Sequence, residues 1–187
     1  MLQRRGAQIG DRIYVTGPLG EAAAGLEVLK RRLSLEPDLK EGLVRAHLDP
    51  RPQLLAGRVL AEHKLASALI DLSDGVATDL GHICRASGVG ARLPAATVPV
   101  SPRVLAAAPI LGREPLDLAL KGGEDYQLLF TSPRGQAPAL FQAFEQAGLA
   151  APLPLGEIIA GAGVLLAGPG GEKEITGEGF DHFRLDL

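Results

Sequence analysis

Apolar residues along the chain recur with two periods, one typical of short strands and the other of amphipathic helices. Short apolar runs predict strands at residues 12–16, 68–71, 91–93, 127–131, 155–159 and 164–167. Helical spacing predicts helices after the turn at residues 17–20 and at residues 39–47, 52–66, 76–87 and 136–147. Strands and helices mixed in this way predict an α/β (α+β) fold, a layered domain in which a mixed β-sheet is flanked by helices.

Buried faces are predicted for the first helix, for the helix at residues 76–87 and for the last helix, and one further helix has a predicted start. The buried face of the first helix is expected to hold Ala22, Leu26, Leu29 and Leu33. The buried face of the last helix is expected to hold Ala137, Leu140, Phe141 and Phe144. Ser101 and Pro102 have the pattern of an N-cap and a first helical residue, because serine accepts a backbone N–H there and proline has none to donate.

Composition and charge exclude several classes of protein. The formal net charge of the 187-residue chain is −3, and no basic stripe is present that would neutralise a nucleic-acid backbone. No apolar run is long enough to span a membrane, and the start of the chain lacks the apolar core of a signal peptide. Cys84 is the single cysteine, so an internal disulfide is impossible and a cytoplasmic location is expected.

The strongest candidate for chemistry is the segment Ile-Asp-Leu-Ser-Asp-Gly at residues 70–75. Side chains alternate along a strand, so Asp71 and Ser73 are expected to point the same way, and Asp74 falls where a helix begins. A helix start favours phosphate oxygens, and carboxylates beside it can hold Mg²⁺, so the segment suits a metal–nucleotide site. The alternative is that Ser73 or Asp74 only caps the helix and that Asp71 is a solvated strand end.

Two pairs of polar residues elsewhere in the chain could belong to the same site. In Gly-Gly-Glu-Asp-Tyr at residues 122–126, the glycines let the backbone approach a ligand, and Glu124 and Asp125 lie at the mouth of the next strand. These acids could position a substrate or help to hold a metal; the alternative is an acidic tight turn before an edge strand. Asp79 and His82, one helical turn apart, are expected to be a solvated pair unless they face the site.

Both ends of the chain hold further candidates. Residues 179–183 read Gly-Phe-Asp-His-Phe, and their rings could stack on a planar, cationic ligand or could instead close the end of the core. Arg4 could grip a phosphate in a bidentate way or be an exposed charge near a terminus. A zinc site is not predicted, because the four histidines are scattered and one cysteine gives no paired ligands.

Together these segments resemble the thiamine-monophosphate kinase family, part of a wider group with aminoimidazole ribonucleotide synthetase, selenophosphate synthetase and a hydrogenase maturation protein. The resemblance rests on segments at residues 4–17, 19–25, 70–83, 121–131 and 179–183, in order along nearly the whole chain. The segment at residues 121–131 and the aromatic tail are particular to the thiamine-phosphate enzymes. For residues 1–187 the resemblance implies a single C-terminal domain, like that of aminoimidazole ribonucleotide synthetase.

The resemblance also implies an activity, the phosphorylation of thiamine monophosphate to thiamine diphosphate, with ATP as donor and Mg²⁺ as cofactor. The implied site consists of Asp71 and Asp74 as metal ligands, Arg4 and Ser73 as contacts of ATP, and Glu124 and Phe180 as contacts of the substrate. The phosphoryl group would pass directly from ATP to the substrate phosphate, so no side chain is expected to form a covalent intermediate.

The chain also departs from the family pattern. Family members start with an amino-terminal domain that carries most of the Mg²⁺-binding aspartates and the homodimer interface, and without it the chain is expected to be nearly inactive. Gln127 stands where the family usually has glutamate, and Arg-Ala-His at residues 45–47 replaces a more usual Arg-His pair. Two alternatives stay open: a sibling enzyme of the selenophosphate synthetase or hydrogenase maturation type, and a non-catalytic module that binds nucleotide or a partner chain.

Overall fold

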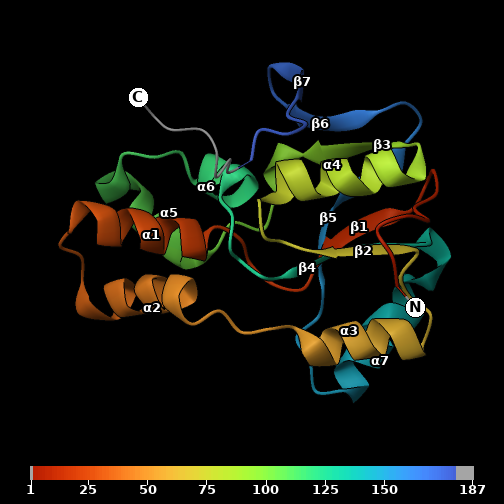
Figure 1. The fold of residues 1–187 in the computed structure, drawn as a ribbon, viewed down its shortest axis with the longest axis horizontal. Helices are drawn as coiled ribbons and strands as arrows, with labels where there is room; N and C mark the ends of the chain where they lie inside the picture. The colour runs from red at the N-terminus through yellow and green to blue at the C-terminus, as the bar shows by residue number, and fades with distance from the viewer. Residues whose placement is uncertain (1, 180–187) are drawn as a thin grey trace.

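A mixed sheet with helices on both faces organises the chain (Figure 1). The structure is a computed structural model that describes residues 2–179. Its strands are β1 (Arg12–Val15), β2 (Ala68–Asp71), β3 (Gly90–Pro94), β4 (Leu128–Ser132), β5 (Leu153–Ile159), β6 (Gly163–Gly168) and β7 (Gly171–Glu174). Their order across the sheet is β2-β4-β1-β5-β3-β6-β7. β3 and β6 run parallel and the other neighbours antiparallel, so the predicted α/β class with a mixed sheet is confirmed.

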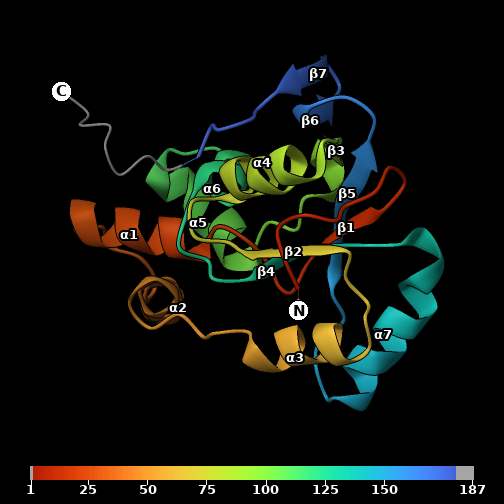
Figure 2. The same ribbon diagram turned by 45° about the vertical axis from the view of Figure 1, so that its right-hand side comes forward.

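The helices form three groups around this sheet. They are α1 (Glu21–Arg31), α2 (Pro37–Leu48), α3 (Leu54–Glu62), α4 (Val76–Ser87), α5 (Pro102–Leu111), α6 (Pro115–Lys121) and α7 (Ala137–Gln146). Figure 2 shows α4 on one face of the sheet and α3 with α7 on the other, while α1, α2, α5 and α6 gather beyond one end of the strands. Within residues 2–179, no helix combines the length and the apolar character needed to cross a membrane.

Alternation along the central strands explains why both faces of the sheet are covered. Ile13 and Val15 of β1 belong to the apolar cluster under α4, whereas Tyr14 between them belongs to the cluster under α3 and α7. Tyr14 is paired with Phe130 of β4, and their rings stack with centroids 5.6 Å apart. β1 and β4 are therefore buried central strands, and β2 lies at the edge beyond β4.

The first helix buries a different face from the one expected. The sequence predicted that Ala22, Leu26, Leu29 and Leu33 would face the core. In the structure Ala24 and Val28 are buried with Ala22, and Leu29 is 38% exposed. The reason is Gly25, where a Cβ would collide with the backbone of Leu43, so α2 packs closely against the side of α1 that carries Gly25.

Other local expectations hold in part. The side chain of Ser101 accepts the N–H of Arg103 at 3.2 Å, which confirms the predicted N-cap of α5. Leu140 and Phe144 of α7 are buried as predicted, but Phe141 is 39% exposed. β7 was not predicted, because its Gly-Glu-Lys-Glu sequence is exposed throughout and carries no apolar alternation.

Candidate functional site

The loop between β2 and α4 carries the first candidate segment. Asp71, the last residue of β2, is exposed, and Ser73 and Asp74 are partly buried. Gly75 is the N-cap residue of α4, with φ 99° and ψ 155°, and makes no side-chain capping bond. The interpretation of Ser73 or Asp74 as the helix N-cap is therefore wrong.

Asp79 reaches back from the first turn of α4 and holds this loop. Its Oδ2 accepts the backbone N–H groups of Ser73 and Asp74, each at 3.0 Å, and the residue is only 1% exposed. Burial, assisted by the charges of Asp74 and Asp71 and opposed by the two N–H groups, raises the pKa of Asp79 to about 6. The expectation of a solvated pair with His82 is wrong for Asp79, because helical spacing does not reveal a bond to the preceding loop.

Potential metal ligands gather around the same loop. Asp74, Asp79 and His82 each offer one ligand atom, and these atoms lie within 4.8 Å of one another. Asp71 lies close enough for its charge to act on Asp79. Mg²⁺ prefers oxygen ligands such as the carboxylates of Asp74 and Asp79, whereas His82 offers a nitrogen. Of the two predicted ligands, Asp74 belongs to this group; among the described residues Asp71, at the end of β2, lies outside it and acts on Asp79 through its charge.

The second candidate segment is hydrogen-bonded along the first. The N–H of Glu124 donates to the carbonyl of Ser73, and the N–H of Tyr126 donates to the carbonyl of Leu72, both at 2.9 Å. A Cβ at Gly123 would collide with the same Ser73 carbonyl. The paired glycines thus allow close backbone approach, as predicted, but the partner is the other candidate loop. Two segments about fifty residues apart in sequence form one surface.

The two adjacent acids of the second loop have different environments. Glu124, at φ 68°, places its Oε2 3.1 Å from Nδ1 of His47 on α2. Asp125 turns inward, and its carboxylate accepts the N–H groups of Gly20 at 2.8 Å and Ala22 at 3.3 Å, at the start of α1. Burial raises the pKa of Asp125 to about 7 against the effect of those N–H groups. The alternative of an acidic turn before an edge strand is wrong, because β4 lies between β2 and β1.

Two cavities border the paired loops, that is, the hydrogen-bonded segments at residues 70–75 and 122–126. One, of about 360 Å³, is lined by Glu124 together with the cationic side chains of Lys30, Arg113 and Lys121. The other, of about 630 Å³, lies between α3 and the β2–β4 side of the sheet; it includes Asp71, and its lining is otherwise mostly apolar. The paired loops therefore adjoin a charged cavity at Glu124 and an apolar cavity at Asp71.

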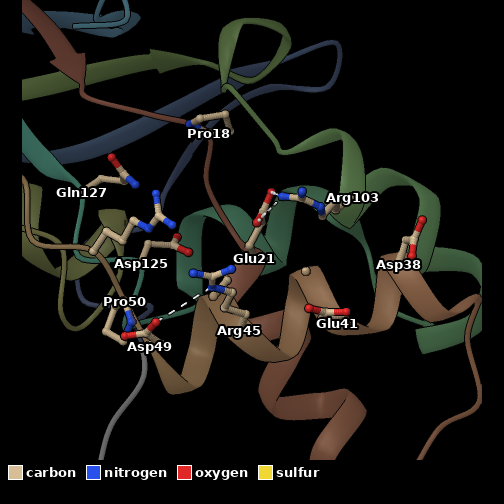
Figure 3. Close-up of a pocket in the computed structure, with 13 residues that line it drawn as sticks. Pro18, Glu21, Asp38, Glu41, Arg45, Asp49, Pro50, Arg103, Asp125 and Gln127 are labelled. Carbon is tan, nitrogen blue, oxygen red and sulfur yellow. Dashed lines mark hydrogen bonds and ion pairs between the residues drawn. The ribbon is translucent and has the colours of Figure 1, made fainter.

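A third cavity, of about 570 Å³, lies between the start of α1, α2 and Gln127 (Figure 3). Its wall carries two ion pairs, Arg45–Asp49 at 3.9 Å and Arg103–Glu21 at 3.2 Å. The Oε1 of Gln127 accepts the hydroxyl of Thr16 at 2.8 Å. Where the resembling family has glutamate, this chain thus has a neutral side chain bonded to the end of β1.

The two remaining predicted residues lie at or beyond the ends of the described chain. The carbonyl of Gln3 accepts the N–H of Leu69 at 2.8 Å, so the segment that carries the exposed Arg4 is hydrogen-bonded to the outer edge of β2. Phe180 lies outside the described residues. Gly179, the last described residue, is so close to Thr78 and to the carbonyl of Asp74 that a Cβ there would collide with both.

Sequence reasoning did not predict the contacts that three residues make on this surface. His47 was noted for an unusual Arg-Ala-His sequence and as one of four scattered histidines, Asp79 was expected to be solvated unless it faced the site, and the cap made by Asp125 was not foreseen. In each case the partner lies in another element, and the residue's own surroundings in sequence give no signal for it. The glycines at residues 122 and 123 were the available signal that two backbones meet here.

Comparison with known proteins finds a family whose profile matches this chain and individual proteins that are similar to it. The profile of a family described as "AIR synthase related protein, C-terminal domain" matches residues 8–166. A thiamine-monophosphate kinase of Escherichia coli O157:H7 is 40% identical over 185 residues, which cover 97% of this chain and 55% of the relative.

Solved structures give the same picture. A thiamine-monophosphate kinase from Stenotrophomonas maltophilia K279a is similar with a TM-score of 0.79 and 36% identity, over 89% of this chain and 53% of that one. A structure of AaThiL complexed with AMPPCP and TMP is similar with a TM-score of 0.76 and 32% identity, over 88% of this chain and 50% of that one. The chain spans about half the length of the relatives it matches.

Proposed function

The chain belongs to the family of AIR synthase related proteins, as their C-terminal domain, and on this premise we propose that it is half of a thiamine-monophosphate kinase. The proposed reaction moves the γ-phosphoryl group of ATP to a phosphate oxygen of thiamine monophosphate, which yields thiamine diphosphate and ADP. Relatives of that name at 40% identity support this assignment over a selenophosphate or hydrogenase-maturation sibling. The AaThiL complex with AMPPCP, an ATP analogue, and TMP supports the same pair of substrates.

One observation carries the proposal: the loop with the candidate metal ligands and the loop with the candidate substrate residue are hydrogen-bonded side by side. The bond from the N–H of Glu124 to the carbonyl of Ser73 joins them. Phosphoryl transfer requires mainly that donor, acceptor and counter-charges be aligned. Adjacent rigid loops that hold the two substrates supply that alignment.

The proposed roles follow from position and charge. Asp71 and Asp74 would hold Mg²⁺, which would supply positive charge to balance that of the phosphates. Ser73 contacts the nucleotide, and Arg4 on the adjoining β2 edge contacts its phosphates. Glu124 orients the substrate.

Phe180 is proposed to pack on the thiamine rings, where a cationic ring would gain from an aromatic face. Its neighbour Gly179 lies against the loop that carries Asp74. The role of Phe180 itself stays a prediction, because the residue lies outside the described part of the chain.

The complete activity is proposed to need an N-terminal domain with further Mg²⁺-binding aspartates, in an enzyme that forms a homodimer. The chain spans only about half of its relatives, so the chain alone should bind poorly and turn over little. The mostly apolar cavity between α3 and β2 supports a surface that another domain covers.

Complementation tests the proposal. The 187-residue chain is mixed with the N-terminal half of the Escherichia coli relative, and thiamine diphosphate formation from ATP and thiamine monophosphate is measured. The wild-type mixture should form product, and Asp71→Asn should abolish it. Asp38→Asn, an exposed aspartate on α2, is the matched control and should retain activity. If the two halves fold and associate but form no product, the assignment is wrong.

A further inference from the structure

We propose that Asp79 is a positioning residue that fixes both candidate loops at once. Its carboxylate holds the peptide groups of Ser73 and Asp74 and, through the Ser73 carbonyl, the backbone of Glu124. The inference deepens the proposed function and rests on it for the roles of Ser73, Asp74 and Glu124.

The first contact lies between α4 and the loop that precedes it. One carboxylate oxygen of Asp79 accepts two successive N–H groups, those of Ser73 and Asp74, each at 3.0 Å. The N–H of Asp79 itself donates to the carbonyl of Gly75 at 2.9 Å, so the residue belongs to the rigid first turn of α4. Bonds from N–H groups to a charged acceptor are the stronger kind, and they connect the loop to a helix.

The second contact runs from that loop to the loop of Glu124. Because Asp79 orients the peptide between Ser73 and Asp74, it also orients the Ser73 carbonyl. That carbonyl accepts the N–H of Glu124 at 2.9 Å. Glu124 has φ 68°, a conformation that a residue with a side chain keeps only where its surroundings hold it. Loss of the Asp79 carboxylate should therefore loosen the proposed nucleotide and substrate sides together.

Mutation of Asp79 in metal-free protein distinguishes a positioning role from a role as metal ligand. Asp79 is 1% exposed, and its Oδ2 already accepts two N–H groups. A residue that acted only as a metal ligand would leave the loop unchanged when mutated in metal-free protein. A positioning residue would alter the loop whether metal is present or not.

Amide hydrogen exchange of the metal-free 187-residue chain, followed by NMR, tests the proposal. Asp79→Ala should lower the protection of the Ser73 and Asp74 amides by about tenfold or more, with a smaller loss at Glu124. Asp79→Asn, which keeps the size of the side chain but not its charge, should give a loss between those of wild type and Asp79→Ala. Ile83→Val, in the core on the same helix, is the control, and it should lower the protection of amides throughout the chain to a similar extent.

A second readout uses the complemented enzyme. There Asp79→Asn should raise the Mg²⁺ concentration for half-maximal rate by about tenfold, and Ile83→Val should not. If the Ser73 and Asp74 amides of both Asp79 variants keep wild-type protection relative to the rest of the chain, the proposal is wrong. If those amides lose protection while the wild-type enzyme shows no Mg²⁺-dependent transfer, Asp79 positions the loops as proposed and the proposed function fails instead.

Discussion

Substitution of Gly75 by alanine tests how closely the backbones of the two loops approach each other. Gly75 has φ 99° and ψ 155°, a region that residues with a side chain almost never adopt, at a cost of about 1–3 kcal/mol. A Cβ there would also lie 2.8 Å from the carbonyl of Gly122 on the second loop. Overpacking of this kind costs a further ~1–3 kcal/mol, so the free energy of unfolding should fall by about 2–6 kcal/mol.

The opposite end of the same helix offers a matched control. Gly88 also has positive φ, at 68°, but a Cβ there would meet no atom of residues 2–179 within 4 Å. Gly88→Ala should therefore cost only the left-handed conformation, about 1–2 kcal/mol. Urea unfolding of both variants, followed by circular dichroism, gives the two free energies. If the free energy of unfolding fell equally in the two variants, the second loop would not lie close enough to Gly75 to hinder a Cβ. That result would refute the reasoning.

Three further predictions concern single side chains. Burial raises the pKa of Asp125 to about 7. Between about pH 4 and pH 7 the folded chain therefore keeps a proton on Asp125 that the unfolded chain has lost. The contribution of this group to the free energy of unfolding should be full below about pH 4 and should be lost as the pH rises towards 7. The difference in urea midpoint between wild type and Asp125→Asn, measured from pH 4 to 8, should follow that decline, and a constant difference would contradict it. Ser101→Ala removes the N-cap of α5 and a hydrogen bond to Glu21, and the free energy of unfolding should fall by ~1–2 kcal/mol in thermal or urea unfolding. Burial raises the pKa of the Cys84 thiol to about 11, so a thiol reagent at pH 8 should react only at the rate of unfolding, and rapid stoichiometric labelling of native chain would show the thiol to be accessible.

Part of the fold was readable from sequence because the signal was local. The run from Ala68 to Asp71 is apolar, ends in an acid and is bounded by turns, so both its strand and its exposed end could be predicted. The prediction for the first helix failed because Gly25 lets α2 approach the small residues of α1. Gly25 and the alanines before it were visible in the sequence, but hydrophobic periodicity gives more weight to the leucines and does not say which helix packs against the small residues.

The residues of the candidate site also differ in whether their role has a local signal in the sequence. The candidates Asp71, Ser73, Asp74 and Glu124 were proposed because acids and glycines cluster in short segments of the sequence. Asp79 and Asp125 looked like surface or substrate acids, yet each is tied to backbone N–H groups of another segment. A carboxylate that holds a loop and one that binds a ligand have the same sequence pattern, so only the fold distinguishes them.

The account depends above all on Asp71 and Asp74 gathering Mg²⁺ at the loop joined to Glu124. Titration of the complemented enzyme with Mn²⁺ in the presence of ATP, read by the relaxation of water protons, tests this directly. Asp71→Asn and Asp74→Asn should each weaken Mn²⁺ binding by about tenfold or more, and the exposed Asp38→Asn should bind as wild type does. Wild-type Mn²⁺ affinity in both loop variants would contradict the account.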